Sequence, residues 1–293
     1  MAGSIAINYA RFEGINRSEL GGAVVMAIAF AVLFVFNVVR SIRHTTYVLV
    51  VLSIFCLIRV TAFTMRAVLS GNEKAGENLN VVIAEGIIYS VGFFGLVYSA
   101  YTLVLDRLRM MRDRHSSNGL ANMILGIICN RRLVRIGLLV AVSLGVAAGS
   151  LTGSDSQSTL NIATALHRAS IYIFLAIVAS LVIVTANLAY DEHKEGMMKH
   201  EASIGRQYRV LVLLAIAFLC LTRESFYAAT AKDSVKQNNA HLWYPLSALP
   251  ELLAVMLFAA PGLVPSRREL AEATANKRSG SGSHDAELQH LSH

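Results

Sequence analysis

The stretch FLCLTRESFYAA, residues 218–229, sets two adjacent formal charges, Arg223 and Glu224, inside an otherwise apolar run. A helix that crosses about 30 Å of hydrocarbon needs about 20 residues, and the run around this pair is that long. Charges at such a depth avoid lipid and face the interior of a helix bundle or a water-filled cavity. The stretch therefore predicts a membrane-spanning helix with one face turned toward polar partners on other helices.

The composition of the whole chain agrees with a membrane protein. Of 293 residues, 55% are hydrophobic and only 15% are charged, and the mean hydropathy is +0.53. Soluble domains carry about 25% charged residues. The net charge of +7 resembles that of a nucleic-acid-binding protein, but the basic residues lie in short loops without interleaved aromatic residues. We therefore expect no nucleic-acid partner.

Seven apolar runs are long enough, or nearly so, to span a bilayer. They predict an all-α fold, a polytopic seven-transmembrane helix bundle, with spans at about 20–39, 47–69, 79–105, 133–149, 168–189, 210–230 and 242–264. Residues 1–19 would form a short outer segment, residues 20–265 the membrane domain, and the polar residues 266–293 a disordered cytoplasmic tail. The apolar stretch 120–129 is too short to cross and predicts an interfacial helix.

Loop charges predict the orientation of the bundle. With seven spans, one side carries 16 Lys and Arg residues and the other side carries five. Positive residues gather on the cytoplasmic side of membrane proteins. We therefore expect the N-terminus outside and the C-terminus in the cytoplasm.

Six ionisable residues fall well inside the predicted spans. Counted by helical rise, they form a layer just outside the midplane and a second layer near the outer rim. The deeper layer holds Arg59, Arg223, Glu224 and Glu251, and the rim layer holds Arg66 and Glu85. We expect Arg59 to pair with Glu251 or Glu224, and Arg66 with Glu85. Because adjacent helical residues diverge by about 100°, Arg223 and Glu224 are expected to have different partners.

Two interpretations of these charges stay open. The pairs either fix the helix register alone or surround an outward-facing polar pocket between the second, third, sixth and seventh spans. Tyr227 and Tyr89 are candidate lining residues of that pocket. Trp243 and Tyr244 are predicted to be an aromatic anchor at the membrane surface.

Motifs of the common enzyme classes do not occur in the sequence. Six histidines, His167 among them, are expected in or beside loops, and Arg135 and Arg168 near span ends. The irregular spacing of Cys56, Cys129 and Cys220 predicts free thiols. We therefore expect no enzyme activity, no metal site and no cofactor.

Residues 205–230, GRQYRVLVLLAIAFLCLTRESFYAAT, carry a family resemblance. They resemble fungal seven-span proteins of the lipid-translocating exporter (aminocholesterol-resistance) group and related uncharacterised fungal membrane proteins. The matching positions are Arg206, Tyr208, Arg209, Glu224 and Tyr227, and Arg59 and residues 248–265 are similar in the uncharacterised relatives. The resemblance implies a fungal membrane protein concerned with lipid asymmetry or resistance to toxic compounds. This chain differs where the group has an Asp soon after the Tyr and a His-Pro before the last span.

Three functions are compatible with these features. The chain could move or bind a lipid or another amphiphile in the outer pocket, act as a receptor-like sensor, or serve as a non-catalytic membrane scaffold. The expected partners are membrane lipids, a small amphiphilic ligand and a cytoplasmic protein bound by the basic loops. The expected location is the plasma membrane.

Overall fold

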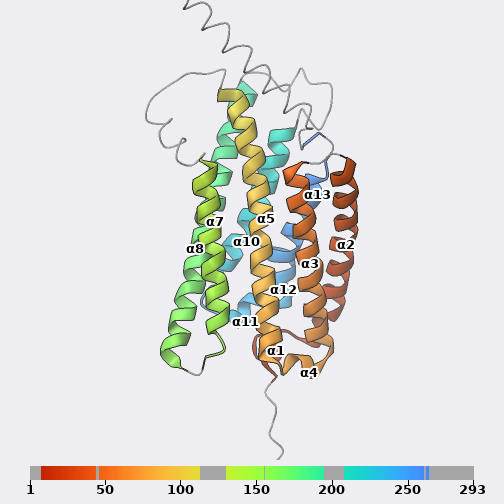
Figure 1. Ribbon diagram of the computed structural model, residues 1–293, viewed down its shortest axis with the longest axis vertical. Coiled ribbons are helices and arrows are strands. Elements are labelled where there is room, and N and C mark those ends of the chain that lie inside the picture. Colours follow the sequence, from red (N-terminus) through yellow and green to blue (C-terminus); the bar gives the residue numbers. More distant parts are fainter. Residues whose placement is uncertain are drawn as a thin grey trace, which may run out of the picture.

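The computed structural model describes residues 8–43, 46–112, 130–154, 156–194, 208–260 and 262–263. These residues form helices and connecting turns, without a strand. Seven helices are long and apolar enough to cross a membrane, which confirms the predicted all-α seven-span bundle (Figure 1). The first six are α2 (Leu20–Arg43), α3 (Tyr47–Gly71), α5 (Leu79–Arg112), α7 (Arg131–Leu151), α8 (Gln157–Lys194) and α10 (Arg209–Thr230).

The seventh span is built from three successive segments. They are α12 (Ala240–Trp243), a π-helical turn at Tyr244–Ala248, and α13 (Leu249–Phe258). Proline has no backbone N–H and disturbs a regular helix. Pro245 lies inside the wider turn, and Pro250 lies in the first turn of α13. Pro245 is therefore accommodated by a π-helical turn, a feature often found at functional sites.

Neighbouring spans in the sequence also pack together in space. Contacts run from α2 to α3, α5, α7, α8, α10 and α13 in turn, and α13 returns to α2. α5 also contacts α8 and α10, so it runs through the middle of the bundle in Figure 1. Its side chains reach most of the other spans.

The largest boundary difference from the sequence prediction lies in α8. We expected this span to begin at residue 168, but the helix begins at Gln157. Residues 157–167 include Ser158, Thr159, Asn161 and Thr164, which lower the hydropathy without breaking a helix. Hydropathy alone therefore placed the helix start too late.

One end of the bundle is covered by short helices, and we call it the α1 end. They are α1 (Tyr9–Phe12), a 3₁₀ turn at Arg17–Glu19, α4 (Glu73–Gly76) and α11 (Ser234–Gln237). Ala10 and Ile15 are buried against Leu69 and Val82. The segment before the first span is thus packed onto the bundle from residue 8 onward.

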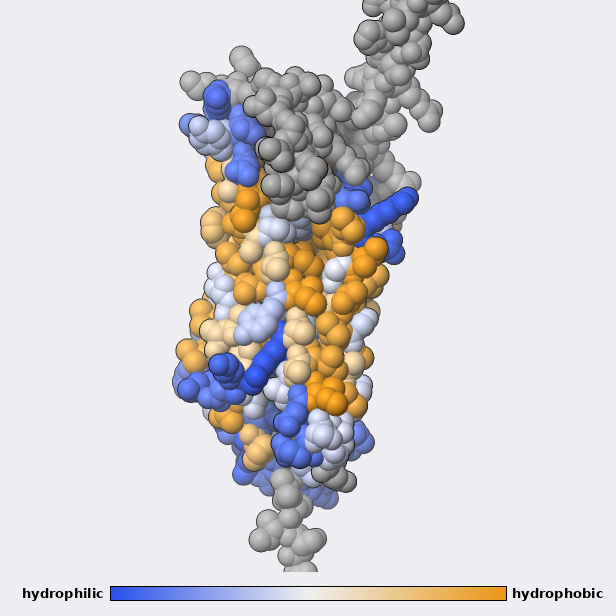
Figure 2. Space-filling model, turned by 90° about the vertical axis from the view of Figure 1, so that its left-hand side faces the viewer, coloured by the Kyte–Doolittle hydropathy of each residue, from blue (hydrophilic) through white to orange (hydrophobic). Residues whose placement is uncertain are grey.

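The surface of the bundle carries an apolar band. Figure 2 shows hydrophobic side chains over the middle of one face and hydrophilic side chains toward both ends. The distribution is that of a membrane-spanning protein. The predicted interfacial helix at 120–129, Cys129 and the predicted disordered tail at 266–293 lie outside the described residues.

Candidate functional site: two buried charge clusters beside a cavity

Four charged residues from three spans meet deep in the bundle, and we call them the deep cluster: Arg59, Arg223, Glu224 and Glu251. Arg59 Nη2 donates to Glu251 Oε1 at 2.6 Å, and Arg59 Nε lies 2.6 Å from Glu251 Oε2. Arg223 Nε lies 2.7 Å from Glu251 Oε1. None of the four residues is more than 4% exposed. Glu251 therefore neutralises two arginines that come from different helices.

The pairing of Arg59 with Glu251 agrees with one of the two predicted alternatives. The expectation that Arg223 and Glu224 have different partners holds for Arg223, which also contacts Glu251, but was wrong for Glu224, whose partner is Arg223. The arginine side chain is long enough to bridge the angle between adjacent helical positions. Glu224 thus pairs with its neighbour in the sequence, and the cluster contains two arginines and two glutamates.

Aromatic rings cover the faces of the deep arginines. The Arg59 guanidinium lies 4.0 Å from the ring centroid of Tyr89, and the Arg223 guanidinium lies 3.8 Å from that of Phe93 and 4.5 Å from that of Tyr227. Such cation–π contacts stabilise desolvated arginines. Arg59 Nη1 also donates to the Tyr89 carbonyl at 2.5 Å. The deep cluster is thus closed off by rings and carboxylates together.

A second cluster lies nearer the α1 end, and we call it the end cluster: Glu19, Arg66 and Glu85. Arg66 Nε donates to Glu19 Oε2 at 3.0 Å, and Arg66 Nη1 donates to Glu85 Oε1 at 3.5 Å. The predicted Arg66–Glu85 pair is therefore present, and Glu19 is a closer partner that the sequence prediction missed. Two buried carboxylates share one arginine.

Glu19 could have been found from a capping pattern. Asn16 and Glu19 form a capping box at the 3₁₀ turn that precedes α2, and this spacing of Asn and Glu is a recognisable sequence signature. The turn carries Glu19 inward until it is only 2% exposed. A hydropathy reading places the residue at the membrane boundary and assigns it no partner.

Trp243 connects the two clusters, and its predicted role as an anchor at the membrane surface was wrong. The residue is only 1% exposed, and Arg66 lies 3.9 Å from its ring centroid. Trp243 Nε1 donates to the Tyr227 hydroxyl at 3.0 Å. The seventh span begins with its aromatic side chain turned inward because the buried guanidinium offers a cation–π partner.

The tyrosines named from the sequence belong to a hydroxyl network. Tyr89 and Ser247 share a hydrogen bond of 2.9 Å, and Ser247 Oγ donates to the Tyr227 hydroxyl at 3.3 Å. Ser247 belongs to the π-helical turn and is fully buried. The turn thus directs a hydroxyl toward α5 and α10 at once.

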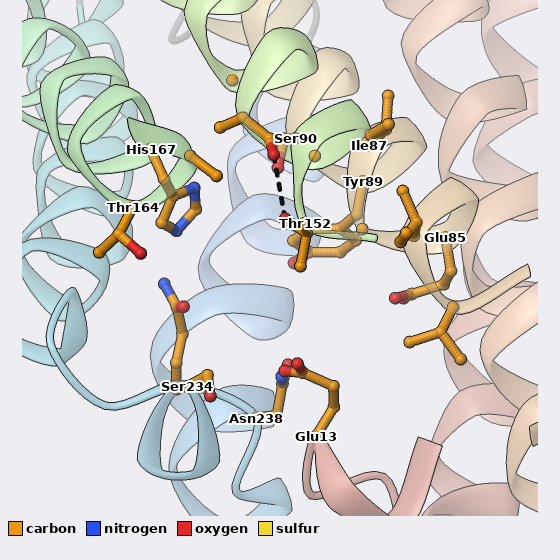
Figure 3. Close-up of a pocket in the computed structure, with 18 of the residues that line it drawn as sticks. Glu13, Glu85, Ile87, Tyr89, Ser90, Thr152, Thr164, His167, Ser234 and Asn238 are labelled. Carbon is orange, nitrogen blue, oxygen red and sulfur yellow. Dashed lines mark hydrogen bonds between the residues drawn. The ribbon is translucent and has the colours of Figure 1, made fainter. Parts of the chain in front are cut away.

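A cavity of about 430 Å³ opens beside the end cluster. Polar side chains and aliphatic side chains both line it (Figure 3). The polar ones include Glu13, Glu85, Ser90, Thr164, His167 and Arg168; the apolar ones include Ile83, Ile87, Ala148 and Leu160. Arg66, Tyr89, Tyr227 and Trp243 also contribute to the lining. Of the predicted site residues, Arg66, Glu85 and Tyr227 therefore reach the cavity, whereas the other four lie in the sealed deep cluster.

His167 and Arg168 are site residues that the sequence prediction misplaced. We expected His167 beside a loop and Arg168 near a span end, but both lie inside α8 and line the cavity. Arg168 Nε donates to the Ala231 carbonyl at 3.4 Å. The late predicted start of the span hid them.

Glu13 enters the cavity from the turn after α1, outside the spans. Burial raises the pKa of its carboxyl above the ordinary value, because desolvation disfavours the charged form. Within the described residues, no group of three or more His, Cys, Asp or Glu side chains could hold a metal ion. The cavity is therefore best described by its charges and its apolar wall.

Comparison with known proteins gives a family. Residues 19–268 match a family described as a domain of unknown function, DUF7702. No curated protein matches the chain, and no solved structure matches it.

Proposed function

The chain belongs to the DUF7702 family, and we propose from its site that it is a multi-pass membrane protein that binds an amphiphile, with the polar end of the ligand in the cavity beside Glu85. The observation that carries the proposal is the cavity itself. Its volume of about 430 Å³ lies in the range of small-molecule sites. One part of its lining suits a polar head and another part an acyl chain.

The apolar part of the lining supports an amphiphile over a fully polar ligand. Ile83 and Ile87 from α5 line the cavity together with the small residues Gly145, Ala148 and Gly149 of α7. Burying a methylene group on such a wall is worth about 0.8 kcal/mol. A ligand with a hydrocarbon chain gains this free energy of burial, whereas a sugar or a free ion does not.

The sealed deep cluster supports binding rather than passage in this conformation. Its four residues are almost completely buried and lie toward the middle of the bundle from the cavity. Movement of a lipid across the membrane would require these ion pairs to separate. We therefore place binding or sensing ahead of lipid transport, and a scaffold without a ligand becomes the outcome if nothing binds.

The surroundings of the site complete the proposal. The excess of Lys and Arg in the loops opposite the α1 end supports an outward-facing cavity in the plasma membrane. The same basic loops also support the proposal that a cytoplasmic protein binds there. We propose no catalytic step. A relation to the lipid-translocating exporter group, and a fungal origin, rest on the resemblance of residues 205–230 and also stay proposals.

Ligand binding is directly measurable because Trp243 is the only tryptophan of the chain and lines the cavity. In nanodiscs, a lysophospholipid should change Trp243 emission in a saturable way. Gly86→Leu should abolish the response, since a Cβ at Gly86 meets open space and a longer side chain would fill the cavity. Gly21→Leu is the matched control, because its Cβ also meets open space but lies away from the cavity. A panel of amphiphiles without any saturable response contradicts the proposal.

Transport and sensing differ in liposomes. A translocase should accelerate flipping of a fluorescent lipid above the rate in protein-free liposomes. We expect lipid flipping at the rate of protein-free liposomes, together with saturable binding of the amphiphile. If the protein accelerates lipid flipping and Gly86→Leu does not, lipid transport is favoured over binding or sensing alone.

A further inference from the structure

Charges of opposite sign line the cavity without pairing across it, and we infer that the polar head it binds is zwitterionic. The inference rests on the proposed binding function and adds the chemistry of the ligand. A zwitterionic head carries a cationic group and an anionic group a few atoms apart. Each wall of the cavity would receive one of them.

The acidic wall has more carboxylates than cations. Glu85 shares Arg66 with Glu19, which lies closer to the guanidinium. Glu13 lines the same cavity, and no Lys or Arg nitrogen of the described residues lies within 4 Å of its carboxylate. Glu13 is half-buried, and a carboxylate that loses water without gaining a cation is destabilised. A ligand ammonium beside Glu13 and Glu85 would supply the missing positive charge.

The opposite wall carries basic side chains without carboxylate partners among the described residues. Figure 3 shows His167 of α8 facing Glu85 across the cavity. Arg168 follows it in α8, and its hydrogen-bond acceptor is the Ala231 carbonyl; no carboxylate of the described residues lies within 4 Å of its guanidinium. Lys232 also lines the cavity. A phosphate or carboxylate of the ligand would find its partners here.

A buried amide supports the anionic position. Gln237 of α11 is 9% exposed and lines the cavity. It lies against His167, and its Nε2 atom makes no hydrogen bond of normal geometry with the described residues. Buried donors are normally satisfied. An anionic oxygen between Gln237 and Arg168 would satisfy it.

Opposite charges on the protein normally collapse into ion pairs, as they do in the deep cluster. Here Glu13 and Arg168 line one cavity without pairing. A purely cationic or purely anionic head would leave one wall uncompensated. A zwitterion compensates both walls, so it should bind more tightly than either single charge on the same chain.

The test compares ligands with equal chains and different heads through Trp243 emission in nanodiscs. The ligands are lysophosphatidylcholine, lysophosphatidic acid, an alkyltrimethylammonium and a monoacylglycerol. Because each charged group of the zwitterionic head would gain a partner of opposite charge, the zwitterion should bind about tenfold more tightly than each of the others. Glycerophosphocholine, a head without chains, distinguishes a free zwitterion from a lipid head.

Variants assign the two walls. Arg168→Gln should remove the advantage of the zwitterion over the cationic ligand, and Glu85→Gln should remove its advantage over the anionic ligand. Glu13→Gln repeats the second test without touching Arg66, in case Glu85→Gln fails to fold. The matched controls are Arg11→Gln and Glu73→Gln, since these residues form an exposed ion pair of 2.6 Å away from the cavity.

The outcomes separate this inference from the proposed function. Equal affinity for all four heads overturns the zwitterion inference and leaves amphiphile binding intact. Binding of none of them overturns the proposed function. If glycerophosphocholine binds as tightly as lysophosphatidylcholine, the charge chemistry is supported and the role of the acyl chain is overturned.

Discussion

At the scale of single residues, the shared carboxylate of Glu251 is the most consequential feature of the bundle. It contacts Arg59 and Arg223, which come from α3 and α10, whereas Glu224 contacts Arg223 in its own helix. Removing one member of a buried ion pair leaves an uncompensated charge. The two glutamates should therefore differ in importance although both are buried.

We expect Glu251→Gln to destabilise the protein more than Glu224→Gln. Loss of Glu251 leaves Arg59 with the Tyr89 carbonyl as its acceptor, and breaking a buried pair from one side costs about 3–5 kcal/mol. Loss of Glu224 leaves Arg223 paired with Glu251. The melting temperature in detergent, measured by size exclusion after heating, checks the order. Glu73→Gln, in an exposed pair, is the control; an equal loss in all three variants would contradict the shared role of Glu251.

A partner test follows from the corrected pairing of Glu224. Combining Glu224→Gln with Arg223→Gln should recover part of the folded yield lost in Arg223→Gln alone, because a carboxylate without a partner is removed together with it. Combining Glu224→Gln with Arg59→Gln should recover less, since these two side chains are linked only through Glu251 and Arg223. Additivity in both double variants would mean that the Arg223–Glu224 pair contributes no coupling.

Glu13 predicts a pH dependence at the α1 end. Burial raises the pKa of this carboxyl in the folded protein, so its neutral form favours folding. Its contribution is fully present below the unfolded pKa and is lost as the pH rises through the higher folded pKa. Glu13→Gln keeps a neutral side chain and should therefore melt higher than the wild type at pH 7, with the difference disappearing toward pH 4. Glu77→Gln, at an exposed position, is the control. A difference in melting temperature between Glu13→Gln and the wild type that grows toward low pH would contradict a raised pKa of Glu13.

At the scale of helices, the approach of α5 to α7 determines one side of the cavity. A Cβ at Gly149 would lie 2.7 Å from Ile87 Cγ1, so α7 can lie this close to α5 only with glycine there. Small residues allow such close approaches in membrane helices. Gly86 on α5 borders the cavity instead and has open space at its Cβ position.

The two glycines should respond differently to the same substitution. Gly149→Ala should lower stability by about 1–3 kcal/mol, the usual cost of overpacking, because Ile87 must shift. Gly86→Ala should leave the melting temperature unchanged or raise it, since alanine favours a helix over glycine. Thermal unfolding of both variants in one detergent checks this. A stable Gly149→Ala would mean that α7 can move away from α5 at little cost.

At the scale of the whole molecule, the seven candidate spans of the described residues predict that the two ends of the chain lie on opposite sides of the membrane. A tag at residue 2 should be accessible from outside intact cells, and a tag at residue 293 only after permeabilisation. The loop charges predict which terminus lies outside. The odd number of candidate spans predicts that the two termini lie on opposite sides. Both tags accessible from one side would contradict the seven-span topology; reversed accessibility would contradict only the orientation.

The sequence predicted the all-helical fold and the seven candidate spans of the described residues. These follow from local hydropathy and helical rise, which need no knowledge of packing. It also predicted the pair Arg66–Glu85 and gave Glu251 or Glu224 as the partner of Arg59, because charges at similar depth on different spans are expected to pair. The predicted start of α8 was wrong because polar residues lower the hydropathy of a segment without breaking the helix.

Which charges share a partner, and where the cavity lies, depends on how the helices pack against one another. Rotation of each helix about its axis turns Trp243 inward, brings Glu19 to Arg66 and closes the deep cluster. The cavity depends on the distances between α5, α7 and α8, and side chains of α1 and α11 reach it from outside the spans. Hydropathy predicts how deep a residue lies in the membrane but not which neighbour its side chain contacts, because those contacts depend on how the seven helices pack.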